Sequence, residues 1–114
     1  GSAAFQLQTC NDNSQPHIPY DLDTPTIWSG RYTASGTTRT FWKTLRSSDG
    51  TASRISAAAT SNCLTPGNKP LRIGCSNAGE MFNGIYSEVI YYNSALTDEA
   101  MESITEGLYV KWLA

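Results

Sequence analysis

The stretch FNGIYSEVIYYNSALTDEAMESI (residues 82–104) decides the class of fold that the rest of the chain must match. Its first half predicts a strand, because residues 84–93 carry large apolar side chains at both odd and even positions. A strand of that kind is expected to be covered on both faces. Its second half changes to helical spacing, with Thr97 as N-cap and Asp98 and Glu99 in the first turn, where the helix dipole favours negative charge.

The predicted helix near the chain end carries one apolar stripe, formed by Met101, Ile104, Leu108 and Trp112. We expect this stripe to be buried on a sheet. Gly107 lies within the run and disfavours helix relative to alanine, so the helix is predicted to end or bend there.

The remainder of the chain is punctuated like an all-β protein. Short runs rich in β-branched and aromatic residues alternate with turn clusters such as ASGT and SSDG. The runs are Phe5–Thr9, Thr26–Thr33, Thr38–Arg46, Ser53–Thr60, Pro70–Gly74 and Gly84–Asn93. Strands at such spacing predict an antiparallel sandwich or barrel.

Alternation within residues 41–46 predicts a strand with one face on a core and the other near solvent. Phe41, Lys43 and Leu45 fall on one face, and the residues between them fall on the other. We expect this strand to form a hairpin with residues 53–60 across the SSDG turn.

Composition limits the classes of function. The 114 residues suit a single domain, 1–114, and the formal net charge of −2 with dispersed Lys and Arg disfavours a nucleic-acid partner. No apolar run is long enough to cross a bilayer, so no membrane insertion is expected.

The three cysteines do not form a metal motif. Cys10, Cys63 and Cys75 lack a C-x-x-C pair, and His17 is the single histidine, so zinc is not expected. Cys63 and Cys75 form either a disulfide across the intervening Pro-Gly turn or two free thiols. Cys10 is then a free thiol or a link to another chain.

The end of the sequence resembles a known family. LRIG followed by FNGIYSEVIYYNSALTDEAMESITEGLYVKW is similar to the closing segment of concanavalin A-like jelly-roll domains of the laminin-G type. The matching positions are Leu71, Ile73, Gly74, Phe82, Gly84, Glu88, Val89, Ile90, Tyr92, Asn93, Ala95, Leu96, Tyr109, Lys111 and Trp112. The resemblance implies an all-β antiparallel sandwich, here a partial jelly roll, with one short C-terminal α-helix.

Complete domains of this type have about twice as many strands as this chain predicts. We therefore expect the C-terminal part of a larger jelly roll, a reduced sandwich, or a sandwich completed by neighbouring chains. The calcium ligands of the family usually lie on loops. The nearest oxygen-rich stretches in this chain are residues 11–14 and Asp21–Asp23, and turn chemistry explains both of them. No cofactor is therefore predicted, and calcium is a minor alternative.

The resemblance implies a non-catalytic extracellular binding or adhesion module that recognises a glycan or a surface protein. Candidate ligand-binding residues are Trp28, Arg31, Tyr32 and Trp42, which lie next to polar turns. Aromatic rings of this kind can stack on sugars while arginine binds their hydroxyls, although a small sandwich also needs its aromatic residues for the core.

Two other classes of function compete with this hypothesis. A structural protein of a phage virion or surface assembly (tail, fibre or capsid decoration) would explain an incomplete sandwich, with the chain extracellular or virion-associated and forming a homo-oligomer. A glycoside hydrolase is disfavoured, because the hydrolases of this fold carry E-x-D-x-x-E and Glu88 stands alone. We expect Glu88 to be a structural carboxylate paired with an arginine or a hydroxyl.

Overall fold

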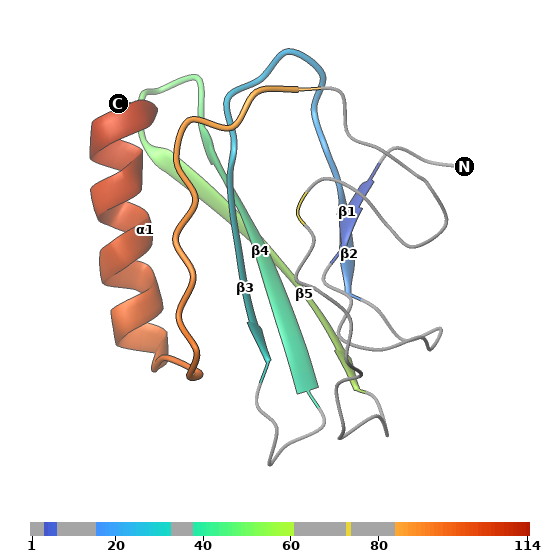
Figure 1. Ribbon diagram of the computed structural model, residues 1–114. Coiled ribbons are helices and arrows are strands. Elements are labelled where there is room, and N and C mark those ends of the chain that lie inside the picture. The colour runs from blue at the N-terminus through green and yellow to red at the C-terminus, as the bar shows by residue number, and fades with distance from the viewer. Residues whose placement is uncertain (1–3, 7–15, 33–37, 61–72, 74–83) are drawn as a thin grey trace.

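The computed structural model describes residues 4–6, 16–32, 38–60, 73 and 84–114. Its elements are β1 (Ala4–Gln6), β2 (His17–Pro19), β3 (Ile27–Tyr32), β4 (Thr38–Arg46), β5 (Ala52–Thr60) and α1 (Asp98–Trp112). Strands β3, β4 and β5 form one antiparallel sheet in that order, and β1 pairs with β2 separately. Figure 1 shows the three-stranded sheet between α1 on one side and the β1–β2 pair on the other.

This arrangement confirms a mostly antiparallel β fold with one C-terminal helix. The sheet is open, because β3 and β5 each pair only with β4 among the described residues. The finer expectation of a sandwich is therefore not established by these layers.

Strand β4 is the centre of the sheet, and its bounds agree with the sequence prediction. Arg39, Phe41 and Lys43 are buried on the face toward β2. The Lys43 ammonium group donates to the carbonyl oxygen of Pro19 at 2.9 Å and to the Asp21 carboxylate at 3.0 Å. A buried cation needs such partners, so these two bonds fasten the end of β2 and the segment after it onto the sheet.

The predicted hairpin of β4 and β5 is confirmed. Ser47 and Thr51 close the turn with a backbone hydrogen bond of 2.8 Å, and Gly50 has a φ of 85°, which a glycine adopts without strain. The Asp49 carboxylate accepts from the Thr51 hydroxyl (2.6 Å), the Thr51 backbone N–H (3.0 Å) and the Ser47 hydroxyl (2.8 Å). These bonds, the Thr51 hydroxyl first, lower the pKa of Asp49 to about 2.

Helix α1 begins as predicted but continues further. The Thr97 hydroxyl accepts from the Ala100 backbone N–H at 3.2 Å, which caps the first turn. Gly107 neither ends nor bends the element, since α1 runs on to Trp112, and that part of the prediction is wrong.

The buried face of α1 is formed by Met101, Thr105 and Tyr109, at intervals of one helical turn. Of the predicted stripe, Met101 is buried and Ile104 and Leu108 are half-buried, but Trp112 is 45% exposed. The stripe prediction is therefore right at one position and wrong at its end. The helix thus faces the sheet with its Thr105 side, and its ion pairs with the sheet are described below.

The prediction of a strand over Gly84–Asn93 is wrong. No strand is assigned to these residues, and every one of them is exposed rather than covered on two faces. The pattern of side chains suits a strand, but no neighbouring strand supplies ladder hydrogen bonds to it within the described residues. A strand requires both a suitable side-chain pattern and a neighbouring strand to pair with. Gly84–Asn93 has the pattern but no paired neighbour among the described residues.

Two further comparisons with the sequence prediction concern short segments. Strand β2 lies in QPHIPY, outside the runs that the sequence predicts as strands. Of the predicted strand Pro70–Gly74 the structure describes only Ile73, in a bend. Cys10, Cys63 and Cys75 lie outside the described residues, so their pairing stays a prediction.

Candidate functional site

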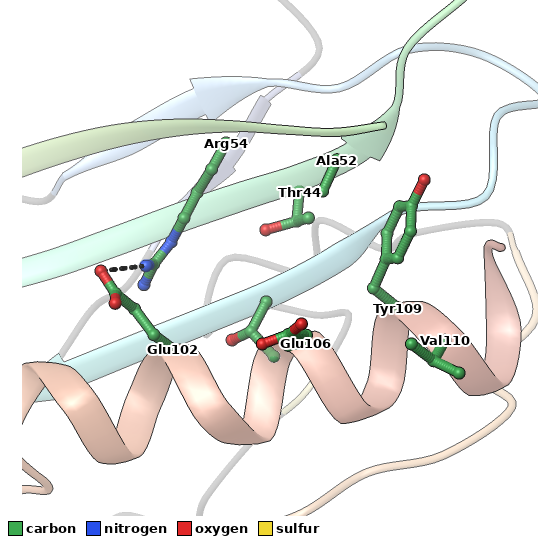
Figure 2. A pocket seen from close by; sticks show the side chains of 8 residues that line it. Thr44, Ala52, Arg54, Glu102, Glu106, Tyr109 and Val110 are labelled. Carbon is green, nitrogen blue, oxygen red and sulfur yellow. Dashed lines mark ion pairs between the residues drawn. The ribbon is translucent and has the colours of Figure 1, made fainter. Parts of the chain in front are cut away.

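A cleft of about 380 Å³ lies between the β4–β5 hairpin and α1. Side chains of the hairpin form one wall of the cleft and side chains of α1 form the facing wall, as Figure 2 shows. The lining residues are Thr44, Ala52, Arg54, Glu102, Thr105, Glu106, Tyr109 and Val110. Polar and apolar groups thus face one opening from elements far apart in the sequence.

Thr44 and Arg54 form the polar part of the sheet side. They are directly opposed cross-strand partners of β4 and β5, so their side chains stand on the same face. Thr44 is 2% exposed, and its hydroxyl has no hydrogen-bond partner among the described residues. The Arg54 Nε–H is likewise buried without a partner in that part of the chain. Leaving a buried hydroxyl unsatisfied costs about 1–3 kcal/mol.

The helix side of the cleft is acidic. Glu102 makes an ion pair with Arg54 Nη1 at 3.4 Å, shown as the dashed line in Figure 2. Glu106 follows one turn later and has no ion pair within the described residues. The lining therefore holds two carboxylates and one guanidinium group, which gives it a net charge of −1.

Tyr109 of α1 closes one end of the cleft and is held in place by a hydrogen bond to the β4–β5 turn. Its hydroxyl donates to the carbonyl oxygen of Gly50 at 2.7 Å, joining the last turns of α1 to the β4–β5 turn. The ring, the Ala52 methyl group and the Val110 side chain are the apolar part of the lining.

A cluster of cations around Trp42 extends from the cleft toward the start of α1. The guanidinium carbons of Arg31 and Arg54 lie 5.4 and 4.9 Å from the centroid of the Trp42 ring. Arg31 also pairs with Asp98 at 2.7 Å and donates to the carbonyl oxygen of Leu96 at 2.9 Å. The arginines are thereby oriented by the indole on one side and by acceptors near the helix N-terminus on the other.

The structure divides the four ligand-binding residues that the sequence predicted. Arg31 and Trp42 lie on the helix side of the sheet, with the cleft. Trp28 and Tyr32 lie at alternate positions and so on the opposite face, where Trp28 stacks on Phe41 with ring centroids 5.3 Å apart. The four residues therefore do not form one site, and their role in binding a ligand stays a prediction.

The cleft residues Thr44, Arg54, Glu102 and Glu106 were missed in the sequence. Two weak signals pointed to them: Thr44 shares its strand face with Trp42, and the two glutamates are spaced four residues apart on one helix face. Neither signal shows that β4 and α1 face each other, so neither predicts a cleft between them.

Glu88 is a paired carboxylate, as predicted, but its partners differ from those expected. The Trp112 indole N–H donates to it at 2.8 Å and the Lys111 ammonium group at 3.0 Å. These two bonds, with that of Trp112 the larger cause, hold the pKa of Glu88 below its ordinary value.

Among the described residues, no group of three His, Cys, Asp or Glu side chains could hold a metal ion. Asp21, in one of the two oxygen-rich stretches, pairs with Lys43 instead. The other stretch, residues 11–14, lies outside the described residues. No helix in the described part of the chain is long and apolar enough to span a membrane.

Comparison of the chain with protein-family models, with curated proteins and with solved structures gave no match in any of the three. The resemblance to concanavalin A-like domains therefore rests on the quoted sequence positions alone and remains a prediction.

Proposed function

We propose that this chain is a non-catalytic recognition module that binds an uncharged glycan in the cleft between the β4–β5 hairpin and α1. One observation carries the proposal: the Thr44 hydroxyl and the Arg54 Nε–H are buried at an open cleft without partners among the described residues. A ligand could bond these two buried atoms only after the lining side chains move apart, and it would then remove the cost of leaving the hydrogen bonds unmade.

The chemistry of the lining favours hydroxyl groups over other ligands. A hydroxyl can accept from the Arg54 Nε–H and also donate to the Glu106 carboxylate. An anionic ligand would be repelled by the two glutamates, whose charge exceeds that of Arg54. An ammonium group could pair with Glu106 but has no acceptor for the Arg54 N–H.

The apolar part of the lining also suits a sugar. A pyranose ring presents C–H groups on its faces and hydroxyls at its edge. The Tyr109 ring, fixed by its bond to Gly50, and the Val110 side chain offer an apolar wall to such a face. Polar groups from the sheet and the helix then meet the hydroxyls.

A glycan array of neutral oligosaccharides, followed by calorimetric titration of the strongest hit, tests the proposal. Thr44→Val keeps the shape of the side chain and removes its hydroxyl, so the affinity is expected to fall about 5- to 10-fold, as for one lost hydrogen bond. The same change should raise the free energy of unfolding by about 1–2 kcal/mol, because a buried unsatisfied hydroxyl disappears.

Opposite effects on binding and stability separate a ligand contact from general damage to the fold. Arg54→Lys retains the positive charge beside Glu102 and removes the Nε–H, so it should also weaken binding. Thr24→Val is the matched control, since its exposed hydroxyl bonds only the nearby Leu22 carbonyl oxygen. An array without hits, or Thr44→Val binding as the parent does, would refute the proposal.

In this proposal the chain acts outside the cell or on a virion, as a partial concanavalin A-like sandwich. A structural protein of a phage virion or surface assembly is the second candidate. It is favoured by a different observation, the exposed apolar side chains of residues 85–92. A particle protein would assemble without sugar, whereas a recognition module would bind sugar as an isolated chain.

A further inference from the structure

The two groups that the proposed ligand would bond are shut off from solvent, although the cleft beside them is open. The Thr44 hydroxyl and the Arg54 Nε–H are both buried, and both residues line the cleft of about 380 Å³. A ligand reaches these groups only after a neighbouring side chain moves. One part of the lining must therefore be movable.

The end of the cleft at Tyr109 is firmly closed. The Tyr109 hydroxyl donates to the carbonyl oxygen of Gly50 at 2.7 Å, and the residue is only 9% exposed. Opening this end would break a hydrogen bond of good length and bring a buried aromatic ring into water. This end is therefore the costly one to open.

The opposite end is closed by the ion pair of Arg54 with Glu102. Figure 2 shows this pair at one end of the cleft and Tyr109 at the other, with Thr44 between them. The Arg54 Nη1 and Glu102 Oε1 atoms are 3.4 Å apart, whereas the ion pair of Arg31 with Asp98 measures 2.7 Å. The Glu102 side chain is 68% exposed, and an exposed pair of this kind favours its closed arrangement by no more than about 5-fold.

The helix itself need not move for this ion pair to open. Asp98 holds the first turn of α1 to Arg31 of β3, and Met101, the residue before Glu102, is buried against the sheet at 8% exposure. Tyr109 holds the later turns. The backbone of α1 is thus anchored before and after Glu102, and the exposed carboxylate is free to swing into solvent.

Arg54 keeps a second contact when the carboxylate leaves. Its guanidinium carbon lies 4.9 Å from the centroid of the Trp42 ring, and this contact does not involve α1. Arg54 is also the directly opposed cross-strand partner of Thr44, so its long side chain stands beside the Thr44 side chain on the same face of the sheet. A turn of the guanidinium group on the indole therefore changes the access to both buried groups.

We infer that the ion pair of Arg54 with Glu102 is a gate of the cleft, which opens when Glu102 swings out and uncovers the Arg54 Nε–H and the Thr44 hydroxyl. Glu102 is then a positioning residue that acts through Arg54 and makes no bond to the ligand. The inference takes the identity of the ligand from the proposed function, but the movement of the gate takes place without any ligand.

Hydrogen exchange of the arginine Nε–H groups, measured by ¹⁵N NMR without ligand, tests the gate directly. In Glu102→Ala the Arg54 Nε–H should exchange with water about 2- to 5-fold faster than in the parent, because the closed arrangement loses its ion pair. The Arg31 Nε–H should be unchanged in the same spectra. Glu99→Ala is the matched control, since Glu99 is an exposed carboxylate of the same helix outside the cleft lining, and it should leave the exchange of Arg54 unchanged.

Calorimetric titration with the strongest neutral oligosaccharide from the array then measures the effect on binding. A ligand that needs the open arrangement should bind Glu102→Ala about 2- to 5-fold more tightly than the parent, and Glu99→Ala as the parent does. Loss of a ligand contact or damage to the fold would weaken binding instead, so the direction of the change identifies a gate.

The two measurements separate this inference from the proposed function. Unchanged exchange of the Arg54 Nε–H in Glu102→Ala overturns the gate, whatever the array shows. Weaker binding of sugar by Glu102→Ala overturns it as well, because Glu102 would then be a ligand contact. An array without hits refutes the glycan proposal, whereas faster exchange in Glu102→Ala alone would still support the gate.

Discussion

Met101→Ala tests how α1 is docked on the sheet. Met101 is 8% exposed and lies at the first buried turn of the helix, one turn before Thr105. Truncating a buried methionine costs about 2–5 kcal/mol, from lost transfer free energy and from the cavity that remains. The open cleft beside the helix lets neighbouring groups relax, so we expect a loss of about 2–3 kcal/mol, at the lower end of that range.

The expected shift in the unfolding temperature follows from the size of the chain. An unfolding entropy of about 2.1 cal/mol/K per residue gives roughly 0.24 kcal/mol/K for a chain of this length. The loss of 2–3 kcal/mol then lowers the midpoint by about 8–12 °C. Urea titration followed by far-UV circular dichroism measures the free energy directly, and a thermal scan checks the shift.

Two further variants make the test specific to the buried face. Ile104→Ala should cost about 1 kcal/mol, because Ile104 is only half-buried. Val110→Ala, at a position 65% exposed, should change stability by less than about 0.5 kcal/mol. If Ile104→Ala costs more than Met101→Ala, the helix docks through the stripe that the sequence predicted. If all three variants match the parent, the helix is not docked.

Two other predictions concern the helix interior and the β4–β5 turn. Gly107→Ala should raise the free energy of unfolding by about 0.5–1 kcal/mol, because alanine favours helix and nothing lies within 4 Å of the added Cβ. Urea titration measures this change, and a loss of stability would show that the position is crowded. The Asp49 pKa of about 2 is below its ordinary value of 3.8, so the stability that Asp49 contributes is present above pH 3.8 and is lost as the pH falls toward 2. Stability curves of the parent and Asp49→Asn should therefore converge in acid, and parallel curves would exclude this turn as a source of the acid sensitivity.

The elements that could be predicted from the sequence are those set by neighbours along the chain. The bounds of β4 and the first turn of α1 depend on alternation, on the SSDG turn and on the Thr97 cap. Each of these signals acts over a few residues. They therefore report the same local structure whether or not the rest of the fold is known.

The segment Gly84–Asn93 shows where local pattern stops being sufficient. Its side chains favour a strand, but a strand exists only where a neighbour offers free N–H and C=O groups in register. None of the described strands pairs with it. The apolar side chains at both odd and even positions, which predicted a covered strand, are exposed in the structure.

Burial on α1 and the cleft were likewise decided by the tertiary structure. Arg31 and Arg54 pair with Asp98 and Glu102, and these contacts accompany a buried face of Met101, Thr105 and Tyr109 in place of the full apolar stripe. The helix lies across the strand face of Thr44, whose buried hydroxyl has no hydrogen-bond partner among the described residues. Sequence determines which face of each element is apolar or charged, but the angle at which two elements cross determines which side chains meet, and that angle is set by contacts between residues distant in the chain.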